Sequence, residues 1–315
     1  MLSRVADALF WMSRYLERAE HVARLLDVYF HLELDLHGVM GGAHELQWTS
    51  LATILQQRVP ATRTDGRPTH AALTDLLTFD AENPGSILSS VTRARANARS
   101  IRGRINATVW KELNKLYWQI SDPATIAQAR ESPHEFFQAV ERGSHLVQGV
   151  CDATLTHDEG WQFIQLGKYI ERADKTLRIL DVQYHLLHGL TDHTDPSLSN
   201  LQWAGVLRSC QAFEAYQKLY VGRVEPERVV EFLLLHAHFP RSVRFALEAV
   251  SSALQTIEGT GPGGKADRIL GRVLGDLRYG EIGEILAGDL HVFLTGLLDR
   301  CSRASLVVQD QYSLR

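Results

Sequence analysis

The apolar residues of this chain recur at helical spacing along most of its length. In the first long segment, Val5, Leu9, Met12 and Leu16 open a series of steps of three and four residues that continues to Phe30. This pattern is typical of a helix packed against other helices. Further helical stretches are predicted over roughly 44–58, 86–118, 133–156, 159–188, 198–221, 227–237, 241–257 and 265–310, the last broken near Gly280. Runs of alternating β-branched residues are nearly absent, so the sequence predicts an all-α fold.

The chain also repeats itself. Residues 15–32 read YLERAEHVARLLDVYFHL and residues 169–186 read YIERADKTLRILDVQYHL, with ten of the eighteen positions identical. Two shorter echoes follow in the same order: Leu46-Gln47-Trp48 with Leu201-Gln202-Trp203, and Arg99-Ser100-Ile101-Arg102 with Arg241-Ser242-Val243-Arg244. We therefore predict an internally duplicated helical bundle, with an N-terminal half at 1–156 and a C-terminal half at 157–315. Long helices with a shared seam favour a pseudo-symmetric pair packed as one globule.

The composition excludes several classes of protein. With 315 residues, of which 45% are hydrophobic, the chain can bury a sizeable core and is not disordered. Its formal net charge of −4 gives no overall attraction to nucleic acid or to a membrane surface, so neither is expected as a partner. Cys151, Cys210 and Cys301 are far apart and odd in number, which favours a reducing compartment. No signal peptide and no membrane span is expected, and the predicted location is the cytoplasm.

Five polar positions are identical in the two copies of the repeat. They are Glu17 and Glu171, Arg18 and Arg172, Arg24 and Arg178, Asp27 and Asp181, and His31 and His185. Arg18 is the most informative, because it lies in a stripe of apolar and aromatic residues, where a guanidinium needs carboxylates, carbonyls or a bound anion. Charged residues spaced in this way along a helix most often form a solvated face or inter-helix salt bridges, and this structural interpretation has the larger weight. The functional alternative is that they line a polar cleft between the halves.

A second cluster follows the turn Asn83-Pro84-Gly85-Ser86, which places Ser86 or Asn83 at a helix N-cap. Five arginines come next, and the spacing of Arg95, Arg99 and Arg102 puts them on one helix face that continues toward Trp110 and Asn114. Three guanidinium groups on one stripe repel each other unless they are neutralised. The candidates are the acids Glu17, Glu20 and Asp27, or else a phosphate or a substrate carboxylate. The other half has no dense arginine cluster, so the N-terminal half is the better candidate for chemistry.

Other motifs carry less weight. Residues 259–266 read GTGPGGKA, but a P-loop needs a preceding strand and a Ser or Thr after the lysine, so a helix–helix connection is expected. Asp27 with His31, and Asp181 with His185, each offer two metal ligands on one helix face. Arginines close by disfavour a cation, so we expect no metal and no cofactor in this chain. No nucleophile elbow is present, and each cysteine fits a core position.

The YLERAE core at 15–20, its copy YIERAD at 169–174 and the segment from Asn83 to Arg102 resemble the alpha-E family, a bacterial all-helical domain named for its Glu-Arg motif. The opening LSRVADALFWMSRYLERAE at 2–20 is similar to the family's N-terminal signature. The resemblance covers essentially the whole chain. It implies association with a circularly permuted ATP-grasp ligase and a transglutaminase-like peptidase, in a system that forms and cleaves amide bonds. The motif carries over at Glu17 and Arg18, and the arginine-rich helix at Arg95, Arg99 and Arg102.

Two main hypotheses follow. In the first, the chain is a helical component of an amide-bond-forming or peptide-modifying system and binds an anionic ligand, a peptide or the ligase through Arg18, Arg95, Arg99, Arg102 and Arg172. Glu17, with Asp27, is then the candidate acid/base, Glu171, Arg178, Asp181 and His185 form a secondary copy, and ATP and Mg²⁺ come with the ligase. In the second, the chain is a non-catalytic scaffold or oligomerisation module whose Arg/Glu network is structural. An enzyme acting unaided is the least supported, and homo-oligomerisation stays open.

Overall fold

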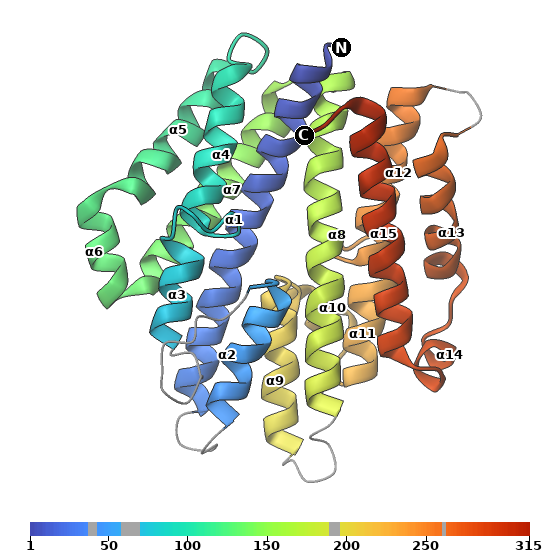
Figure 1. Ribbon diagram of the computed structural model, residues 1–315. Coiled ribbons are helices and arrows are strands. Elements are labelled where there is room, and N and C mark those ends of the chain that lie inside the picture. The colour runs from blue at the N-terminus through green and yellow to red at the C-terminus, as the bar shows by residue number, and fades with distance from the viewer. Residues whose placement is uncertain (37–42, 58–69, 189–195, 260–262) are drawn as a thin grey trace. The chain divides into compact units, whose positions relative to one another are not determined.

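A computed structural model describes residues 1–36, 43–57, 70–188, 196–259 and 263–315, with side chains except at 35–36, 43–47, 185–188 and 196–198. The described residues form fifteen α-helices and no β-strand (Figure 1), which confirms the all-α prediction. The chain divides into two compact units, Met1–Lys168 and Tyr169–Arg315. None of the described helices is both long enough and apolar enough to cross a membrane.

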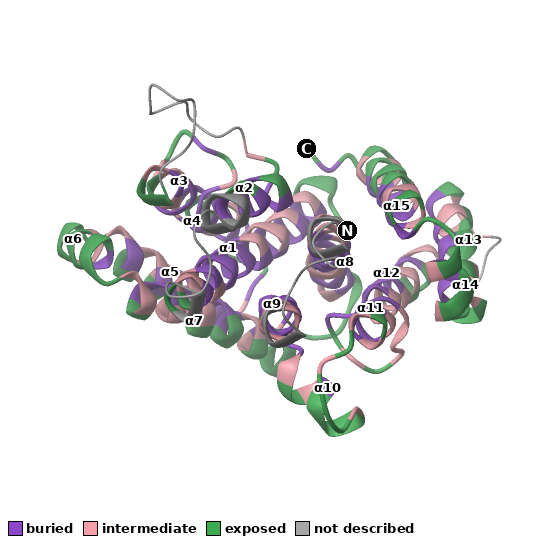
Figure 2. Ribbon diagram, turned by 90° about the horizontal axis from the view of Figure 1, so that it is seen from below, coloured by how far each residue is buried: buried purple, intermediate pink, exposed green. Residues whose placement is uncertain are grey.

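The first unit contains seven helices and the start of an eighth. They are α1 (Ser3–Leu36), α2 (Ala43–Ile54), α3 (His70–Thr78), α4 (Ile87–Ser100), α5 (Ala107–Ser121), α6 (Pro123–Glu131), α7 (Pro133–Thr154) and α8 (Glu159–His188). The long helix α1 is central, because it packs against both α4 and α7, and α5 packs against α4 and α7 in turn. Figure 2 shows that buried residues cover much of α1, whereas α6 is mostly exposed. Phe10, Met12 and Leu26 are almost fully buried on α1, and each contributes about 1.5–3 kcal/mol of stability.

The second unit contains the rest of α8 and seven further helices. They are α9 (Pro196–Ser209), α10 (Phe213–Leu219), α11 (Pro226–Leu235), α12 (Val243–Glu258), α13 (Lys265–Tyr279), α14 (Ile282–Ala287) and α15 (Leu290–Tyr312). Within this unit α13 packs against α12 and α15, and α11 contacts α9, α12, α13 and α14. The predicted break near Gly280 is confirmed, since the Gly280 N–H bonds to the carbonyl of Asp276 at 2.9 Å and closes α13.

Two predicted helices are each interrupted in the structure. The stretch 86–118 divides into α4 and α5, and Asn106 caps the second by accepting from the Thr108 N–H at 2.8 Å. The stretch 198–221 divides into α9 and α10 around Gln211, which has a positive φ of 49°. Both interruptions lie in sequences without proline, where apolar spacing continues across the break.

The unit boundary falls inside α8, twelve residues beyond the predicted boundary at 156/157. The first turns of α8 belong to the first unit because they approach α1 closely. The Ser13 hydroxyl donates to the carbonyl of Ile164 at 2.7 Å, and a Cβ at Gly167 would lie 2.2 Å from the Phe10 carbonyl oxygen. Glycine is therefore required at this contact. That the two halves pack as one pseudo-symmetric globule stays a prediction.

Serine N-caps open equivalent turns in the two units. Ser86 Oγ accepts from the Ser89 N–H at 3.1 Å and donates to the Asp80 carbonyl at 2.6 Å, as the sequence predicts for this cap. Ser242 Oγ likewise accepts from the Phe245 N–H at 3.1 Å and donates to the His236 carbonyl. The echo of Arg99–Arg102 in Arg241–Arg244 is therefore misaligned, because the first segment closes α4 whereas the second opens α12.

Candidate functional site

A seam of polar side chains runs along the contact between α1 and α7. Glu17, the first member of the repeated Glu-Arg pair, is only 1% exposed. Its Oε2 accepts a hydrogen bond at 3.0 Å from Gln148 Nε2 on α7. A buried carboxylate needs such donors, since an unsatisfied charge in the interior is strongly destabilising. Glu17 therefore helps to join the two helices.

One turn further along α1, a buried ion pair forms the centre of the seam. Glu20 and Arg24 are 0% and 4% exposed and pair with each other at i, i+4 spacing. Arg24 Nη2 also donates to His21 Nδ1 at 3.0 Å, and His145 Nε2 of α7 lies 3.4 Å from Glu20 Oε1. The guanidinium of Arg24 is thus engaged by neighbours on its own helix.

Glu141 of α7 adds another carboxyl group to the seam. Burial raises the pKa of Glu141, while Arg24 opposes that shift and Glu20 and Asp27 reinforce it. Four carboxyl groups, those of Glu17, Glu20, Asp27 and Glu141, therefore gather where α1 meets α7. The seam is acidic rather than basic toward its Asp27 end.

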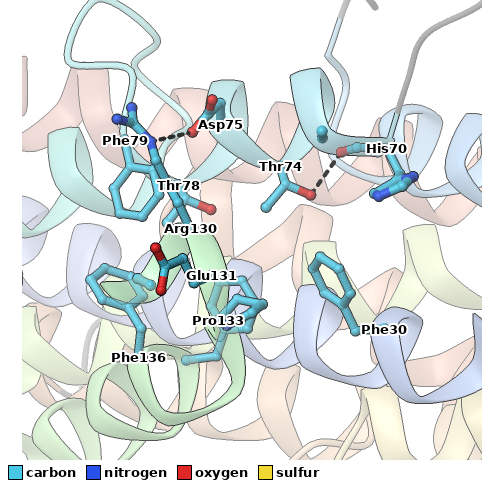
Figure 3. Close-up of a pocket in the computed structure, with 13 residues that line it drawn as sticks. Phe30, His70, Thr74, Asp75, Thr78, Phe79, Arg130, Glu131, Pro133 and Phe136 are labelled. Carbon is cyan, nitrogen blue, oxygen red and sulfur yellow. Dashed lines mark hydrogen bonds and ion pairs between the residues drawn. The ribbon is translucent and has the colours of Figure 1, made fainter. Parts of the chain in front are cut away.

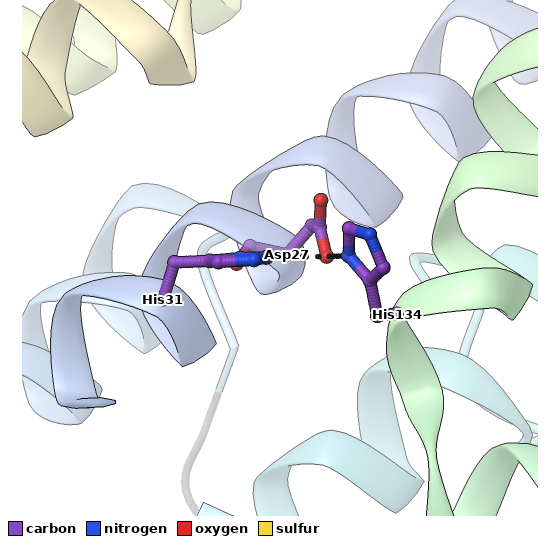
Figure 4. A group of neighbouring side chains, drawn as sticks. All are labelled: Asp27, His31 and His134. Carbon is purple, nitrogen blue, oxygen red and sulfur yellow. Dashed lines mark hydrogen bonds and ion pairs between the residues drawn. The ribbon is translucent and has the colours of Figure 1, made fainter. Parts of the chain in front are cut away.

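At that end, Asp27 lies between two histidines (Figure 4). His134 Nδ1, from the start of α7, lies 2.6 Å from Asp27 Oδ1. His31, one turn along α1, places its Nδ1 2.8 Å from the backbone oxygen of Asp27 and 3.8 Å from its Oδ1. The two imidazole rings meet edge to face with their centroids 4.9 Å apart.

The predicted arginine cluster lies elsewhere, on α4 and in the turn that follows it, and two of its members contact α5. Arg95 donates to Asn114 Oδ1 at 2.7 Å and its guanidinium lies 4.3 Å from the Tyr117 ring centroid. Arg102 lies over Trp110 at 5.3 Å, and Arg99 is exposed. Within the described part of the chain, no carboxylate forms an ion pair with any of these three arginines. We call Arg95, Arg99 and Arg102, with the rings of Trp110, Tyr117 and Trp118, the arginine face.

The acids and arginines that the sequence grouped together are thus separated. Glu17, Glu20 and Asp27 contact α7, whereas the arginine face lies on α4 and α5. Of the two alternatives for neutralising the three arginines, pairing with these acids does not occur among the described residues, because helix periodicity gives the faces of a helix but not which neighbour each face meets.

Arg18 is half-buried and lies near a different arginine of α4. Its guanidinium is 5.4 Å from the ring centroid of Tyr15, and the guanidinium of Arg93 is 5.8 Å from the same ring. The aromatic ring thus brings two cations into one neighbourhood of the α1–α4 contact. The predicted companions Arg95 and Arg102 instead lie over rings of α5.

In the second unit, Arg178 repeats the i, i+4 ion pair of Arg24, whereas Glu171 and Arg172 make other polar contacts than Glu17 and Arg18. Glu171 is buried, with Lys175 Nζ 3.7 Å from its Oε1, and Arg172 is also buried and donates to the Pro240 carbonyl at 3.4 Å. Arg178 makes two hydrogen bonds of 2.9 Å to Asp174. Burial alone would raise the pKa of Asp174, but Lys175 and Arg178 outweigh it and lower that pKa.

Asp181 also keeps a histidine partner. His291 Nδ1, near the start of α15, lies 2.6 Å from Asp181 Oδ1. The side chain of His185 lies outside the described residues. The sequence reasoning missed His134 and His291, which stand 107 and 110 residues after their aspartates. The similar separation, close behind a helix start in both cases, was a signal that could have found them.

A cavity of about 420 Å³ lies elsewhere in the first unit, between α1, α3, α6 and α7 (Figure 3). Aromatic rings of Phe30, Phe79 and Phe136 line it, together with the ion pair between Arg130 and Asp75 at 3.2 Å. No predicted site residue lines this cavity. Nucleophilic chemistry by a thiol is not favoured either, because burial raises the pKa of both Cys151 and Cys301 to about 12.

Comparisons with known proteins agree with the sequence resemblance. A family model named Alpha-E, described as a predicted alpha-helical domain with a conserved ER motif, matches residues 1–312. An uncharacterized protein of Mycobacterium bovis is 27% identical over 313 residues, and one of Mycobacterium tuberculosis strain H37Rv is 26% identical over 313 residues. Each match covers 94% of this chain but only 35% of the relative, so the chain spans about a third of the length of these relatives. No solved structure matches the chain.

Proposed function

The chain belongs to the alpha-E family, and from that premise we propose that it is a helical component of an ATP-grasp-linked system that forms amide bonds or modifies a peptide. In this proposal it binds an acidic peptide, or an acidic surface of the ligase, through the arginine face. The ligase brings ATP and Mg²⁺, a transglutaminase-like peptidase is a second partner, and the complex works in the cytoplasm. The ligase and peptidase enter through the family resemblance alone.

The observation that carries the binding proposal is the charge of the arginine face. Arg95 is held by Asn114 and Tyr117, so its guanidinium is oriented before any ligand arrives. Arg99 lies exposed in the last turn of α4 and Arg102 lies exposed in the turn that follows, and no described carboxylate pairs with them. Like charges along one stripe favour an anionic partner, and planar guanidinium groups bind carboxylates by paired hydrogen bonds.

The length of the relatives supports a role alongside other domains. In the mycobacterial relatives the matched region is about a third of the chain, so this helical domain there accompanies a larger remainder. A charged surface on a domain of this kind suits contact with another domain or with a peptide passed between them. Arg172 is buried and bonded to the Pro240 carbonyl, so we leave it out of the binding surface.

The second candidate function is a scaffold, and the polar seam favours it. Glu17 is buried and bonded to Gln148, while Glu20 and Arg24 form a buried pair. These contacts give Glu17, the carboxylate of the Glu-Arg motif, a structural role between α1 and α7. We therefore assign no acid/base step to Glu17, and the seam holds the first unit together under either candidate function.

We also infer that the two units arose by duplication. The identities at 15–32 and 169–186 are matched by serine caps at Ser86 and Ser242 and by two Asp–His contacts of 2.6 Å. The arginine face has no equivalent among these repeated features. A pair of units in which one copy acquired a binding surface fits this pattern.

The test compares variants on and off the arginine face. The double variant Arg99→Glu/Arg102→Glu reverses two exposed charges, and Arg142→Glu reverses an exposed charge on α7 as the matched control. Binding of a hexaglutamate peptide and of the ATP-grasp ligase from the same organism is measured by calorimetry and by copurification. We expect the double variant to weaken binding by about tenfold or more, the control to bind as the parent does, and the circular dichroism melting curves to coincide. Equal binding by all three proteins would exclude the arginine face as the site, and failure of the parent to bind either probe would favour the scaffold.

A further inference from the structure

We propose that Asp27, His31 and His134 form a binding site for a divalent transition-metal ion such as Zn²⁺. One ligand atom from each of the three residues lies within 4.8 Å of the others (Figure 4). Two imidazoles and one carboxylate are a ligand set that suits zinc and iron. This proposal is independent of the arginine face, which lies on other helices.

The fold of the first unit positions the three ligands from two helices. Asp27 and His31 are one turn apart on α1, so their side chains project from the same face. His134 is the second residue of α7, which begins at Pro133 and packs against α1. The site is therefore supported by helix backbones on both sides.

The hydrogen bond of His31 prepares it as a ligand. Its Nδ1 lies 2.8 Å from the Asp27 backbone oxygen, and a carbonyl can only accept. Nδ1 therefore carries the proton, and the lone pair is on Nε2. Histidines that bind metals commonly hold one ring nitrogen in this way, with the other nitrogen turned to the ion.

The electrostatic surroundings favour a cation here. The sequence argument against metal was based on nearby arginines, but Arg24 pairs with Glu20 and donates to His21. The carboxyl group of Glu141 is close enough to Asp27 for each to influence the other.

Binding requires small movements of exposed side chains and the loss of a proton from His134. Its Nε2 accepts from Gln138 Nε2 at 2.8 Å, so its Nδ1 carries the proton that the ion would displace. A tetrahedral zinc ion holds nitrogen and oxygen ligands at about 2.0–2.2 Å, so neighbouring ligand atoms lie about 3.3–3.6 Å apart. The 2.6 Å contact between Asp27 and His134 has to lengthen and the 4.8 Å span has to shorten. The side chains of His31 and His134 are 53% and 45% exposed, so both can rotate. Three protein ligands leave a coordination position for water or an anion.

The second unit supplies an independent observation. Asp181 and His291 repeat the 2.6 Å contact of Asp27 and His134, and the aspartates are 15% and 16% exposed. His185 follows Asp181 by four residues, as His31 follows Asp27. If the Asp–His contact served only to join two helices, a second histidine four residues after the aspartate would not be needed in either unit.

The competing explanation is that each Asp–His contact only joins two helices and binds no metal ion. His31 separates the two explanations, since its hydrogen bond is to its own helix and not to α7. Replacing His31 leaves the contact between Asp27 and His134 in place but removes a metal ligand. Replacing His134 would remove both.

The experiment uses the full chain without a histidine tag, stripped by chelator and then titrated with Co²⁺ and Zn²⁺. Calorimetry gives the stoichiometry and affinity, and the visible spectrum of Co²⁺ reports nitrogen and oxygen ligands. We expect the parent to bind at a site that His31→Ala loses, with the affinity at that site falling by about tenfold or more. His157→Ala is the matched control, because His157 is exposed, stacks on Trp161 and lies 3.9 Å from the carboxylate of Asp152.

The outcomes are distinct. Binding that is the same in His31→Ala and in the control would overturn the proposal, as would a parent protein that binds neither ion. Retained melting temperatures in the His31→Ala variant show that any loss of binding is local. Peptide binding by the arginine face is measured separately, so failure of either proposal leaves the other standing.

Discussion

Gln148 Nε2 donates a hydrogen bond to the buried carboxylate of Glu17 at 3.0 Å, across the contact between α7 and α1. Truncating the acid in Glu17→Ala leaves the amide without this acceptor and opens a gap in a packed interface. We expect a loss of about 1–3 kcal/mol in the free energy of unfolding. Glu17→Gln keeps the size and an acceptor oxygen and should cost less. Urea unfolding followed by circular dichroism measures both, and an equal loss in the two variants would contradict this account.

Arg24 and Arg178 occupy the same place in the repeat but differ in burial. Arg24→Met leaves Glu20 charged and 0% exposed, so we expect a loss of about 3–5 kcal/mol. Arg178→Met leaves the partly exposed Asp174, and the loss should be nearer to 1 kcal/mol. Unfolding by urea compares the two variants directly. The double variant Glu20→Leu/Arg24→Met should recover much of the first loss, and no recovery would mean that the ion pair is not its cause.

Asp174 predicts a pH dependence of stability. Its pKa in the folded protein is lowered from the ordinary value of 3.8, through Lys175 and Arg178 acting against burial. A lowered carboxyl pKa stabilises the fold above the unfolded pKa, and this stabilisation is lost as the pH falls through the folded pKa. We expect the parent to be more stable than Asp174→Asn at neutral pH, with a difference that shrinks below about pH 4. Melting curves across this range test the prediction, and a difference independent of pH would contradict it.

Two helix glycines should respond in opposite ways to alanine. A Cβ at Gly167 would lie 2.2 Å from the Phe10 carbonyl oxygen, so Gly167→Ala must separate α8 from α1 and should cost about 1–3 kcal/mol. A Cβ at Gly149 on α7 meets nothing within 4 Å, so Gly149→Ala should stabilise the helix by about 0.5–1 kcal/mol. Thermal melting compares the pair. A loss in both variants would point to a general intolerance of substitution.

The periodicity of apolar residues predicted the local structure well, because a helix face is determined by the pattern of residues within a short stretch of sequence. The all-α class, the Ser86 cap and the break at Gly280 are all visible in short stretches of sequence. The break between α4 and α5 was missed, since no proline marks it and Asn106 caps the new helix by a single side-chain bond.

The candidate site was only partly predictable. Glu17 and Asp27 were singled out, but their partners Gln148 and His134 are distant in sequence and become neighbours only when α7 packs on α1. The same limit explains the misplaced arginines. Spacing put Arg95, Arg99 and Arg102 on one face, and packing then turned that face toward α5 instead of the acids of α1.

The position of the unit boundary decides how this protein can be divided in the laboratory. A fragment that stops at residue 156 removes the Ile164 carbonyl that accepts from Ser13 and the Gly167 backbone that covers Phe10. Buried apolar surface on α1 would then face solvent, and such a fragment is prone to aggregate. Truncation at Lys168 retains both contacts, although it cuts through a continuous helix rather than a loop.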